Sequence, residues 1–310
     1  MPGQVRIGIS GWTYKPWRGV FYPQGLAHKR ELQYASAQFD SIEINGTFYG
    51  LQRPSSFESW AAETPGNFAF AIKGSRYITH MLRLRNAEAA LANFFASGVL
   101  KLGQKLGPIL WQFPASFRFD LGVFESFLQL LPTDMDGVAD LARRHDPRLD
   151  GRAFVDAIAK CPVRHAVEIR HESFVTPAFT QLLRRYNVAL VCADAVEWPL
   201  LMDVTADFVY CRLHGSKELY VSGYEADAID EWAHRVVAWA TGKGNVEGRY
   251  ADPANNAAIG KQRDVYVYFD NDAKVRAPFD AIDLKRRVAE LGAPSDPSGG
   301  AGLQQQHKET

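Results

Sequence analysis

Residues 165–186, HAVEIRHESFVTPAFTQLLRRY, contain one complete strand–loop–helix unit. The first six residues form a short, largely apolar run typical of a buried strand, and Thr176-Pro177 is a helix start signal. Between strand and helix lie four charged side chains: Glu168, Arg170, His171 and Glu172. Because buried charge is costly unless it is paired, this strand end is either a polar rim or a site.

The same unit recurs along the chain. Strand-like runs occupy 5–10, 41–45, 68–73, 107–113, 165–170, 188–194, 208–214 and 264–270. Helical patterns occupy 29–39, 54–63, 87–100, 121–131, 152–160, 178–186, 230–240 and 277–291, whereas 132–152 is polar and is interpreted as a connection or marginal helix. Eight alternating units predict an α/β fold, a closed (β/α)8 TIM barrel. An open doubly wound sheet is the alternative, but the loop ISGWTYKPW after the first run is no dinucleotide fingerprint.

We predict a single barrel domain over residues 1–292, followed by a disordered, low-complexity C-terminal tail over 293–310. Lys plus Arg and Asp plus Glu are equal at 35 each, which argues against a nucleic-acid partner. Three cysteines without CxxC spacing indicate a reducing compartment. No apolar run approaches about 18 residues, so we expect a soluble, cytoplasmic protein with no membrane partner. No signal in the sequence predicts an oligomeric state.

Polar residues collect at the ends of the predicted strands. In a parallel barrel these ends meet at one mouth, where ligands bind. Successive side chains of a strand point to opposite faces, so Glu43 shares a face with Asn45, Glu168 with Arg170, and Arg212 with His214. The residues between them are apolar and would pack against the helices. We therefore expect the polar set to point into the barrel mouth, although Glu/Arg ladders also serve as structural networks that hold strand register.

Seven segments of the chain resemble the domain of unknown function 72, or YecE-like, family. They are GISGWTYKPWRGVFYP (8–23), FDSIEINGTFYG (39–50), FAFAIKGSRYITH (68–80), LGPILWQFP (106–114), AVEIRHESF (166–174), YCRLHGS (210–216) and VYVYFDND (265–272). The resemblance runs from about residue 5 to 291. It implies a TIM barrel that has been compared with sugar isomerases, without an established reaction. Asp270 stands where the family commonly has Asn, which keeps an oxygen ligand but adds charge.

The favoured hypothesis is an enzyme that acts by acid/base chemistry on a small anionic or phosphorylated carbohydrate-like substrate, without a cofactor. Arginine and lysine bind phosphate or carboxylate, and the loop HGSKE (214–218) lies in the usual phosphate-binding region of this fold. The predicted catalytic residues are Glu43, Glu168, Asp194 and His214. The predicted substrate-binding residues are Trp12, Asn45, Tyr49, Lys73, Gln112, Arg170, Arg212, Tyr224 and Asn271.

Three alternatives stay open. A sugar isomerase or epimerase would bind Mg²⁺ or Mn²⁺ through Glu168, Asp194, His214 and Asp270, but Arg170 and Arg212 would repel the cation. Glycoside hydrolysis would use Glu43 and Glu168 as its carboxyl pair. A nucleic-acid-binding or nuclease barrel would use KGSRYITHMLRLR (73–85), against the neutral overall charge.

Overall fold

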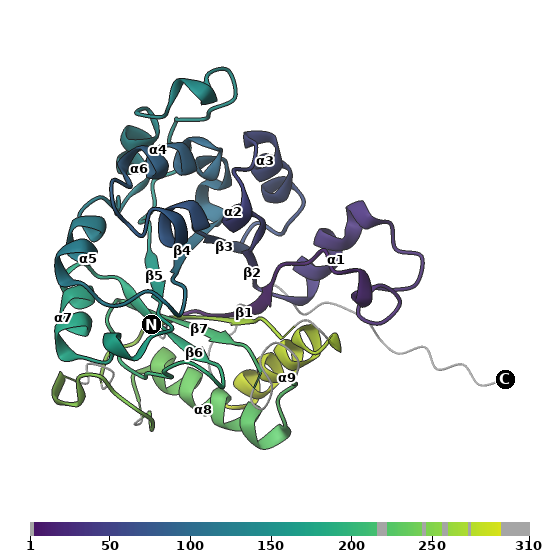
Figure 1. Cartoon of the computed structure of the whole chain (residues 1–310). Helices are drawn as coiled ribbons and strands as arrows, with labels where there is room; N and C mark the ends of the chain where they lie inside the picture. The colour runs from purple at the N-terminus through teal and green to yellow at the C-terminus, as the bar shows by residue number, and fades with distance from the viewer. Residues whose placement is uncertain (1–2, 216–221, 244–245, 256–259, 272–273, 293–310) are drawn as a thin grey trace.

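Eight parallel strands close into a barrel in the order in which they follow along the chain (Figure 1). The structure is a computed structural model that describes residues 3–215, 222–243, 246–255, 260–271 and 274–292. The strands are β1 (Val5–Ser10), β2 (Ser41–Ile44), β3 (Ala69–Lys73), β4 (Leu106–Gln112), β5 (His165–Glu168), β6 (Ala189–Asp194), β7 (Phe208–Leu213) and β8 (Asp264–Phe269). The predicted (β/α)8 TIM barrel is confirmed. The predicted C-terminal tail, 293–310, lies outside the described residues.

The two faces of the strands carry different residues, as their period of two predicts. Outward-facing Ile42, Val167 and Leu213 belong to the main hydrophobic core between strands and helices. The inner face forms a separate, smaller cluster that is rich in alanine and tyrosine: Ala69, Ala71, Leu110, Ala166, Ala189, Val191, Ala193, Ala206, Phe208, Tyr210, Tyr266 and Tyr268. Near the carboxyl ends of the strands this inner face becomes charged, which places the polar set inside the barrel.

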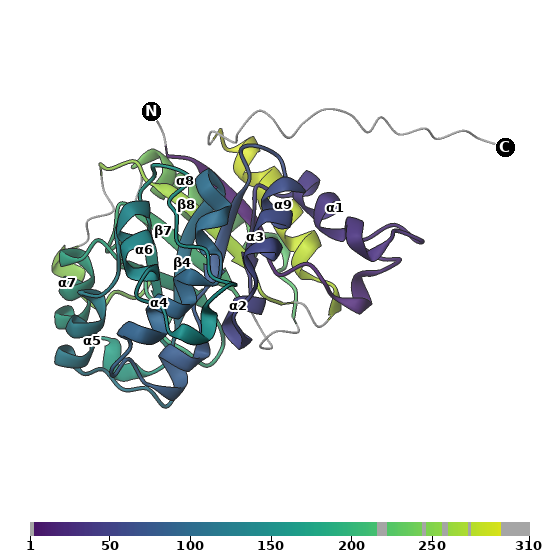
Figure 2. The same ribbon diagram turned by 90° about the horizontal axis from the view of Figure 1, so that it is seen from above.

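Helices surround the barrel (Figures 1 and 2). They are α1 (Glu31–Gln38), α2 (Gly46–Tyr49), α3 (Pro54–Ala62), α4 (Glu88–Ala96), α5 (Leu121–Leu128), α6 (Met135–Ala142), α7 (Pro177–Arg185), α8 (Ala226–Thr241) and α9 (Ala277–Glu290). α4 stops short of the predicted residue 100 because Gly98 has φ 122°, a conformation that favours glycine. Within the described residues, no helix combines the length and apolar character needed to cross a membrane.

One helix lies in a different place from the prediction. Residues 152–160 form no helix, and α6 instead occupies the polar segment 132–152. The Asp134 carboxylate accepts a hydrogen bond from the Gly137 N–H at 2.7 Å, which caps the helix start. α6 then buries Met135, Val138 and Leu141 at helical spacing. The predicted helix at 152–160 is therefore wrong, whereas α6 forms the marginal helix that was one of the two interpretations of 132–152.

The connection between β1 and α1 is long and aromatic. In both views α1 and the chain before it stand out from one side of the barrel (Figures 1 and 2). Trp17 is fully buried in this connection, with its ring 4.6 Å from that of Tyr14 and 6.1 Å from that of Tyr22. This packing holds the segment beside α3, and the two together border a groove described below.

Candidate functional site

Arg212 on β7 is the centre of a buried ion network inside the barrel. Its Nε and Nη2 donate to the two carboxylate oxygens of Glu43, on β2, at 3.1 and 2.9 Å. Its Nη1 donates to Glu168 Oε2, on β5, and its Nη2 to Asp270 Oδ2, just after β8, both at 2.6 Å. The guanidinium thus bonds carboxylates from three strand ends, and the Arg212 and Glu168 side chains are 0% exposed.

Two hydroxyl groups complete the surroundings of Glu43. Ser10 Oγ at the end of β1 donates at 3.0 Å and the Tyr210 hydroxyl donates at 2.5 Å. Burial, reinforced by the negative charge of Glu43, raises the pKa of Tyr210 well above its ordinary value, so the phenol keeps its proton. Both oxygens of Glu43 are therefore bonded by protein groups.

His214 lies between two carboxylates of the same network. Its Nδ1 is 3.3 Å from Asp270 Oδ2, and its Nε2 is 3.6 Å from Glu168 Oε2. The Trp198 ring packs edge-to-face against the imidazole with a centroid distance of 5.1 Å. These contacts fix the ring plane between two carboxylates, and Arg212 Nη1 also lies 3.4 Å from His214 Nε2.

The carboxylates of the network are held in the charged form. Burial by itself would raise the pKa of Glu168, but Arg212, Arg170 and His214 together lower it well below its ordinary value. Asp270 behaves in the same way, since burial is outweighed by Arg212, His214 and Lys73. Glu168 and Asp270 are thus negatively charged beside the Arg212 guanidinium, which favours further positive charge nearby.

Arg170 supplies that charge at the solvent side of the network, where the Lys73 amine also lies. Arg170 Nε and Nη2 are 2.9 and 2.8 Å from Glu168 Oε1, and the guanidinium stacks 3.6 Å from the Trp198 ring. Its Nη1 has no acceptor in the part of the chain that the structure describes. The Lys73 side chain at the end of β3 is likewise without a hydrogen-bond or ion-pair partner among those residues, and its Nζ lies 4.5 Å from the Phe48 ring.

The pKa of His80 indicates the charge at the solvent side of the network, which we call the rim of the barrel mouth. Its pKa is lowered to about 4, first by burial and then by four cationic side chains: Arg170, Lys73, Arg76 and Arg83. Its Nδ1 lies 2.8 Å from Thr79 Oγ1, and its ring packs edge-to-face on Phe48. The rim of the barrel mouth beside β3 is therefore electropositive, whereas the layer beneath it is rich in carboxylates.

Asp194 does not join this network, contrary to its predicted place beside Glu168 and His214. Its carboxylate accepts a hydrogen bond from Trp232 Nε1 on α8 at 3.0 Å. β6 turns Ala193 to the inside of the barrel, so Asp194 faces outward with Cys192. Because both faces of this strand are apolar in sequence, the pattern alone left its inward side ambiguous.

The predicted metal site is not formed by these residues. Asp194 lies on the opposite side of its strand, and the Arg212 guanidinium occupies the space between Glu168 and Asp270. Across the described residues, no group of three or more His, Cys, Asp or Glu side chains is arranged to hold a metal ion. The donor set of Glu168, Asp194, His214 and Asp270 therefore does not fit Mg²⁺ or Mn²⁺.

Other predicted binding residues lie away from the network. Tyr224 is buried outside the barrel, where its hydroxyl accepts from the Gly215 N–H at 3.2 Å. Asn271 Nδ2 donates to Asp280 on α9 at 2.8 Å, since it follows Asp270 and must face the other way. Gln112 is an exception, since it lies opposite Glu168 in the strand register and shares the inward face of Leu110; its Nε2 donates to the Phe113 carbonyl at 2.7 Å. Tyr49 is 71% exposed at the end of α2.

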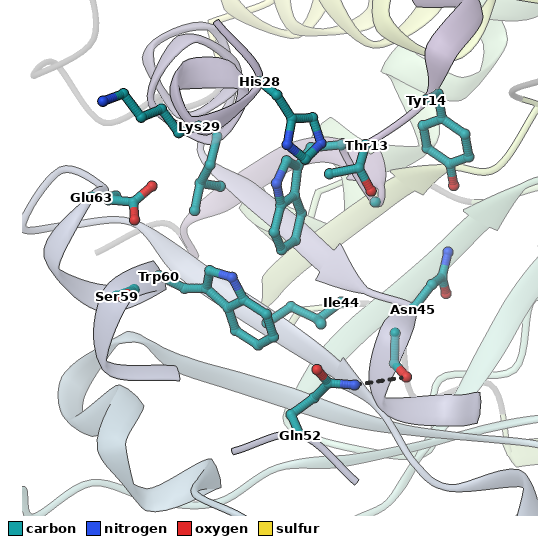
Figure 3. Close-up of a pocket in the computed structure, with 14 residues that line it drawn as sticks. Thr13, Tyr14, His28, Lys29, Ile44, Asn45, Gln52, Ser59, Trp60 and Glu63 are labelled. Carbon is teal, nitrogen blue, oxygen red and sulfur yellow. Dashed lines mark hydrogen bonds between the residues drawn. The ribbon is translucent and has the colours of Figure 1, made fainter. Parts of the chain in front are cut away.

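Beside the network lies a cavity of about 470 Å³, the Trp12–Trp60 groove. Trp12 follows β1, and its ring meets that of Trp60 on α3 edge-to-face at 5.6 Å. Figure 3 shows the polar groups around Trp60. The lining residues are Gly11, Trp12, Thr13, Tyr14, His28, Lys29, Leu32, Ile44, Asn45, Gly46, Gln52, Ser59, Trp60 and Glu63. Predicted residues Trp12 and Asn45 thus line this groove.

Several residues of the two regions were missed by the sequence analysis. Tyr210 shares a face with Arg212 two positions later, so strand periodicity could have found it. Trp60, Trp198 and His80 lie on segments without a local signal, and only the fold brings them to the site. Residues 216–218 of the predicted phosphate-binding loop HGSKE lie outside the described residues.

Comparison with known proteins identifies the family. The family described as "Protein of unknown function DUF72" matches residues 6–301. UPF0759 protein YunF from Bacillus subtilis is 29% identical over 118 residues, covering 36% of this chain and 41% of YunF. UPF0759 protein YecE from Escherichia coli is 26% identical over 133 residues, covering 43% of this chain and 46% of YecE, so both alignments span less than half of the curated relative.

The fold agrees with a solved member of the same family. The crystal structure of a DUF72 family protein from Thermotoga maritima superposes with a TM-score of 0.67 and 23% identity. The superposition covers 92% of this chain and 99% of that chain. Because the family match extends over most of the sequence, the chain belongs to the DUF72 family.

Proposed function

We propose that this protein is an enzyme whose active site is the carboxyl-terminal mouth of the barrel. Its substrate is a small anionic, carbohydrate-like molecule, and the reaction is acid–base chemistry. One observation carries the proposal: the donors of Arg212 are bonded to protein carboxylates, whereas Arg170 and Lys73 keep donors available beside them. A purely structural network would have no need of cations left partly unbonded at its solvent side.

We assign a role to each side chain according to whether its donors are already bonded to other protein groups. Arg170 binds the anionic group, and stacking on Trp198 holds its guanidinium in place. Arg212 is a positioning residue that keeps Glu43, Glu168 and Asp270 in register. This revises its predicted part as a direct substrate ligand.

His214 is the group that moves a proton, since its ring nitrogens lie 3.3 Å from Asp270 and 3.6 Å from Glu168. Asp270, 3.3 Å from Nδ1, orients the ring. Glu168, held ionised by the arginines, is a weak base by itself and instead stabilises positive charge that develops on His214. Trp12 and Asn45 in the adjoining groove would contact the uncharged part of the substrate.

The other hypotheses have less support. A metal-dependent isomerase would need Glu168 and Asp270 to bind one metal ion together, but the Arg212 guanidinium lies between these two carboxylates. Glycoside hydrolysis would need two carboxyl groups flanking a sugar bond, but Glu43 and Glu168 are both fully buried and bonded to the same guanidinium. The basic stretch 73–85 is no continuous surface for nucleic acid, because Ile78 and Thr79 are fully buried within it.

Calorimetric titration with phosphorylated and neutral forms of the same monosaccharides tests the proposal. We expect the phosphorylated forms to bind and the neutral forms to bind at least about tenfold more weakly, because charge-assisted hydrogen bonds contribute about 1.5–3 kcal/mol. Arg170→Met should abolish this preference. Arg249→Met is the matched control, since Arg249 is an exposed arginine paired with Glu172. Equal affinity for neutral and phosphorylated sugars, or identical binding by both variants, would contradict the proposal.

A further inference from the structure

We propose that Lys73 is a nucleophilic amine that forms an imine with the carbonyl group of a small aldehyde or ketone bound in the barrel mouth. The inference rests on the proposed function for the place of the site, and deepens it by naming the reactive atom and the substrate class. It follows from the position of Nζ, its lack of bonding partners and the charges around it.

Lys73 is aimed into the barrel by its strand. Ala69 and Ala71 face the inside of β3, so the period of two turns Lys73 the same way. The backbone on either side is held firmly, since Lys73 lies opposite Leu110 on β4 and its carbonyl accepts from Thr47 Oγ1 at 2.7 Å. The Lys73 side chain thus extends into the barrel from a firmly held strand end, beside the small side chains of Ala69 and Ala71.

Its amine differs from that of Lys105, which is half-buried. Lys105 Nζ donates to the Ala61 carbonyl at 2.6 Å and to the Thr64 carbonyl and hydroxyl at 2.7 and 3.1 Å. Those three acceptors fully solvate an ammonium group. Lys73 is 8% exposed, yet among the described residues its Nζ has only the face of Phe48. Burial without acceptors disfavours the ammonium form and leaves a lone pair available.

The net effect of the surroundings on Lys73 is to lower its pKa. Burial, followed by the positive charge of Arg212, lowers the pKa of Lys73, while Asp270, Glu43 and Glu168 oppose the shift. Lys73 also acts electrostatically on His80 at the rim, together with Arg170, Arg76 and Arg83. The amine is therefore unprotonated at a lower pH than an ordinary lysine, as a nucleophile requires.

The chemistry balances with groups already present. The neutral Nζ attacks the carbonyl carbon, and its proton moves to the carbonyl oxygen to give a carbinolamine. The hydroxyl then takes one proton from solvent and leaves as water, while the nitrogen lone pair forms the C=N bond and the N–H is kept, which gives a protonated imine. The charges of Asp270, Glu43 and Glu168 favour a positive charge on this nitrogen, and they therefore also favour the protonated imine. Because the rim is electropositive, a carbonyl compound that carries a phosphate fits best.

Reductive trapping on the full chain tests the inference. Dihydroxyacetone phosphate is incubated with the protein, sodium borohydride delivers hydride to the imine carbon, and peptide mass spectrometry locates the secondary amine formed. We expect modification of Lys73 at least about tenfold faster than of exposed Lys15, and none at Lys105, whose amine is occupied. The pH at which trapping reaches half of its maximal rate should lie below the ordinary pKa of a lysine side chain.

Lys73→Arg provides the matched variant, with folding checked by circular dichroism. This variant should give no secondary amine at position 73. If the variant fails to fold, the rates of modification of Lys73, Lys15 and Lys105 in the wild-type protein still test the inference. Trapping of Lys73 no faster than of Lys15, or no trapping at all, overturns the inference. Selective binding of phosphorylated sugars without trapping would overturn this inference alone. Trapping with dihydroxyacetone and its phosphate at equal rates would instead contradict the anionic substrate of the proposed function.

Discussion

The ion network inside the barrel and the Trp12–Trp60 groove lie next to each other, at the ends of β1 and β2, yet they are built in opposite ways. Ser10 and Glu43 belong to the network, whereas Gly11, Trp12 and Asn45 line the groove. In the network Arg212, Glu43 and Glu168 are fully buried, Asp270 is 13% exposed, and the guanidinium bonds all three carboxylates. The groove combines half-buried rings with exposed polar side chains such as His28 and Lys29.

Because the two regions are built differently, we expect substitutions in them to have different effects on stability. A buried charge that loses its partner is left in a medium of low polarity, so one substitution disturbs the whole network. Aromatic contact in the groove is a sum of many weak interactions, so each side chain contributes in proportion to its buried area. The network provides fixed geometry, and the groove provides contact surface.

The largest expected effect is that of Arg212→Met. It leaves Glu43, Glu168 and Asp270 buried without their shared cation, so the free energy of unfolding should fall by about 3–5 kcal/mol. Urea denaturation measures the change. Arg286→Met is the control, because Arg286 pairs with Asp283 and Glu290 at the surface. A loss no greater than that of the control would show that the network has no special role in stability.

Acidification should weaken the network without any mutation. Glu168 has a lowered pKa in the folded protein, so it contributes stability above the ordinary carboxyl pKa of about 4, and this is lost as pH falls toward the folded value. Between pH 5 and 3 the free energy of unfolding should therefore decrease. Glu168→Gln should flatten this decrease by up to about 1.4 kcal/mol per pH unit, the slope for one proton. Parallel curves for both proteins in urea would refute the expectation.

Removing an aromatic ring from the groove should have an intermediate effect. Trp60→Ala loses the edge-to-face contacts with Trp12 at 5.6 Å and Phe57 at 5.1 Å. Because Trp60 is only half-buried, we expect a decrease of about 2 kcal/mol in the free energy of unfolding, below the range for a fully buried tryptophan. Chemical denaturation followed by far-UV circular dichroism gives the value. A loss as large as that of Arg212→Met would remove the proposed contrast.

The smallest effect is expected at an exposed ion pair. Glu172 and Arg249 are 2.8 Å apart, but their side chains are 64% and 52% exposed. Glu172→Gln should change the free energy of unfolding by less than about 1 kcal/mol, and the change should shrink further in 1 M salt. The same denaturation assay applies, and a salt-independent loss above 2 kcal/mol would mean that exposure does not separate this pair from the network.

The sequence predicted the barrel well because its signals are local. Apolar runs, helix start signals and the period of two are properties of short segments, and they placed all eight strands and the inward faces of Glu43, Glu168 and Arg212. For 132–152 the polar composition allowed either a connection or a marginal helix, and the cap of Asp134 begins a helix there. The outward turn of Asp194 was missed because both faces of β6 are apolar.

By itself, then, the sequence determined that charged side chains from several strands would converge inside a closed barrel. The tertiary structure decided how they pair. Only the three-dimensional arrangement uses the donors of Arg212 on three carboxylates, leaves Lys73 without an acceptor among the described residues, and brings Trp60 against Trp12. The physical reason is that strand periodicity is set by neighbouring residues, whereas pairing in a barrel depends on contacts between residues far apart in the chain.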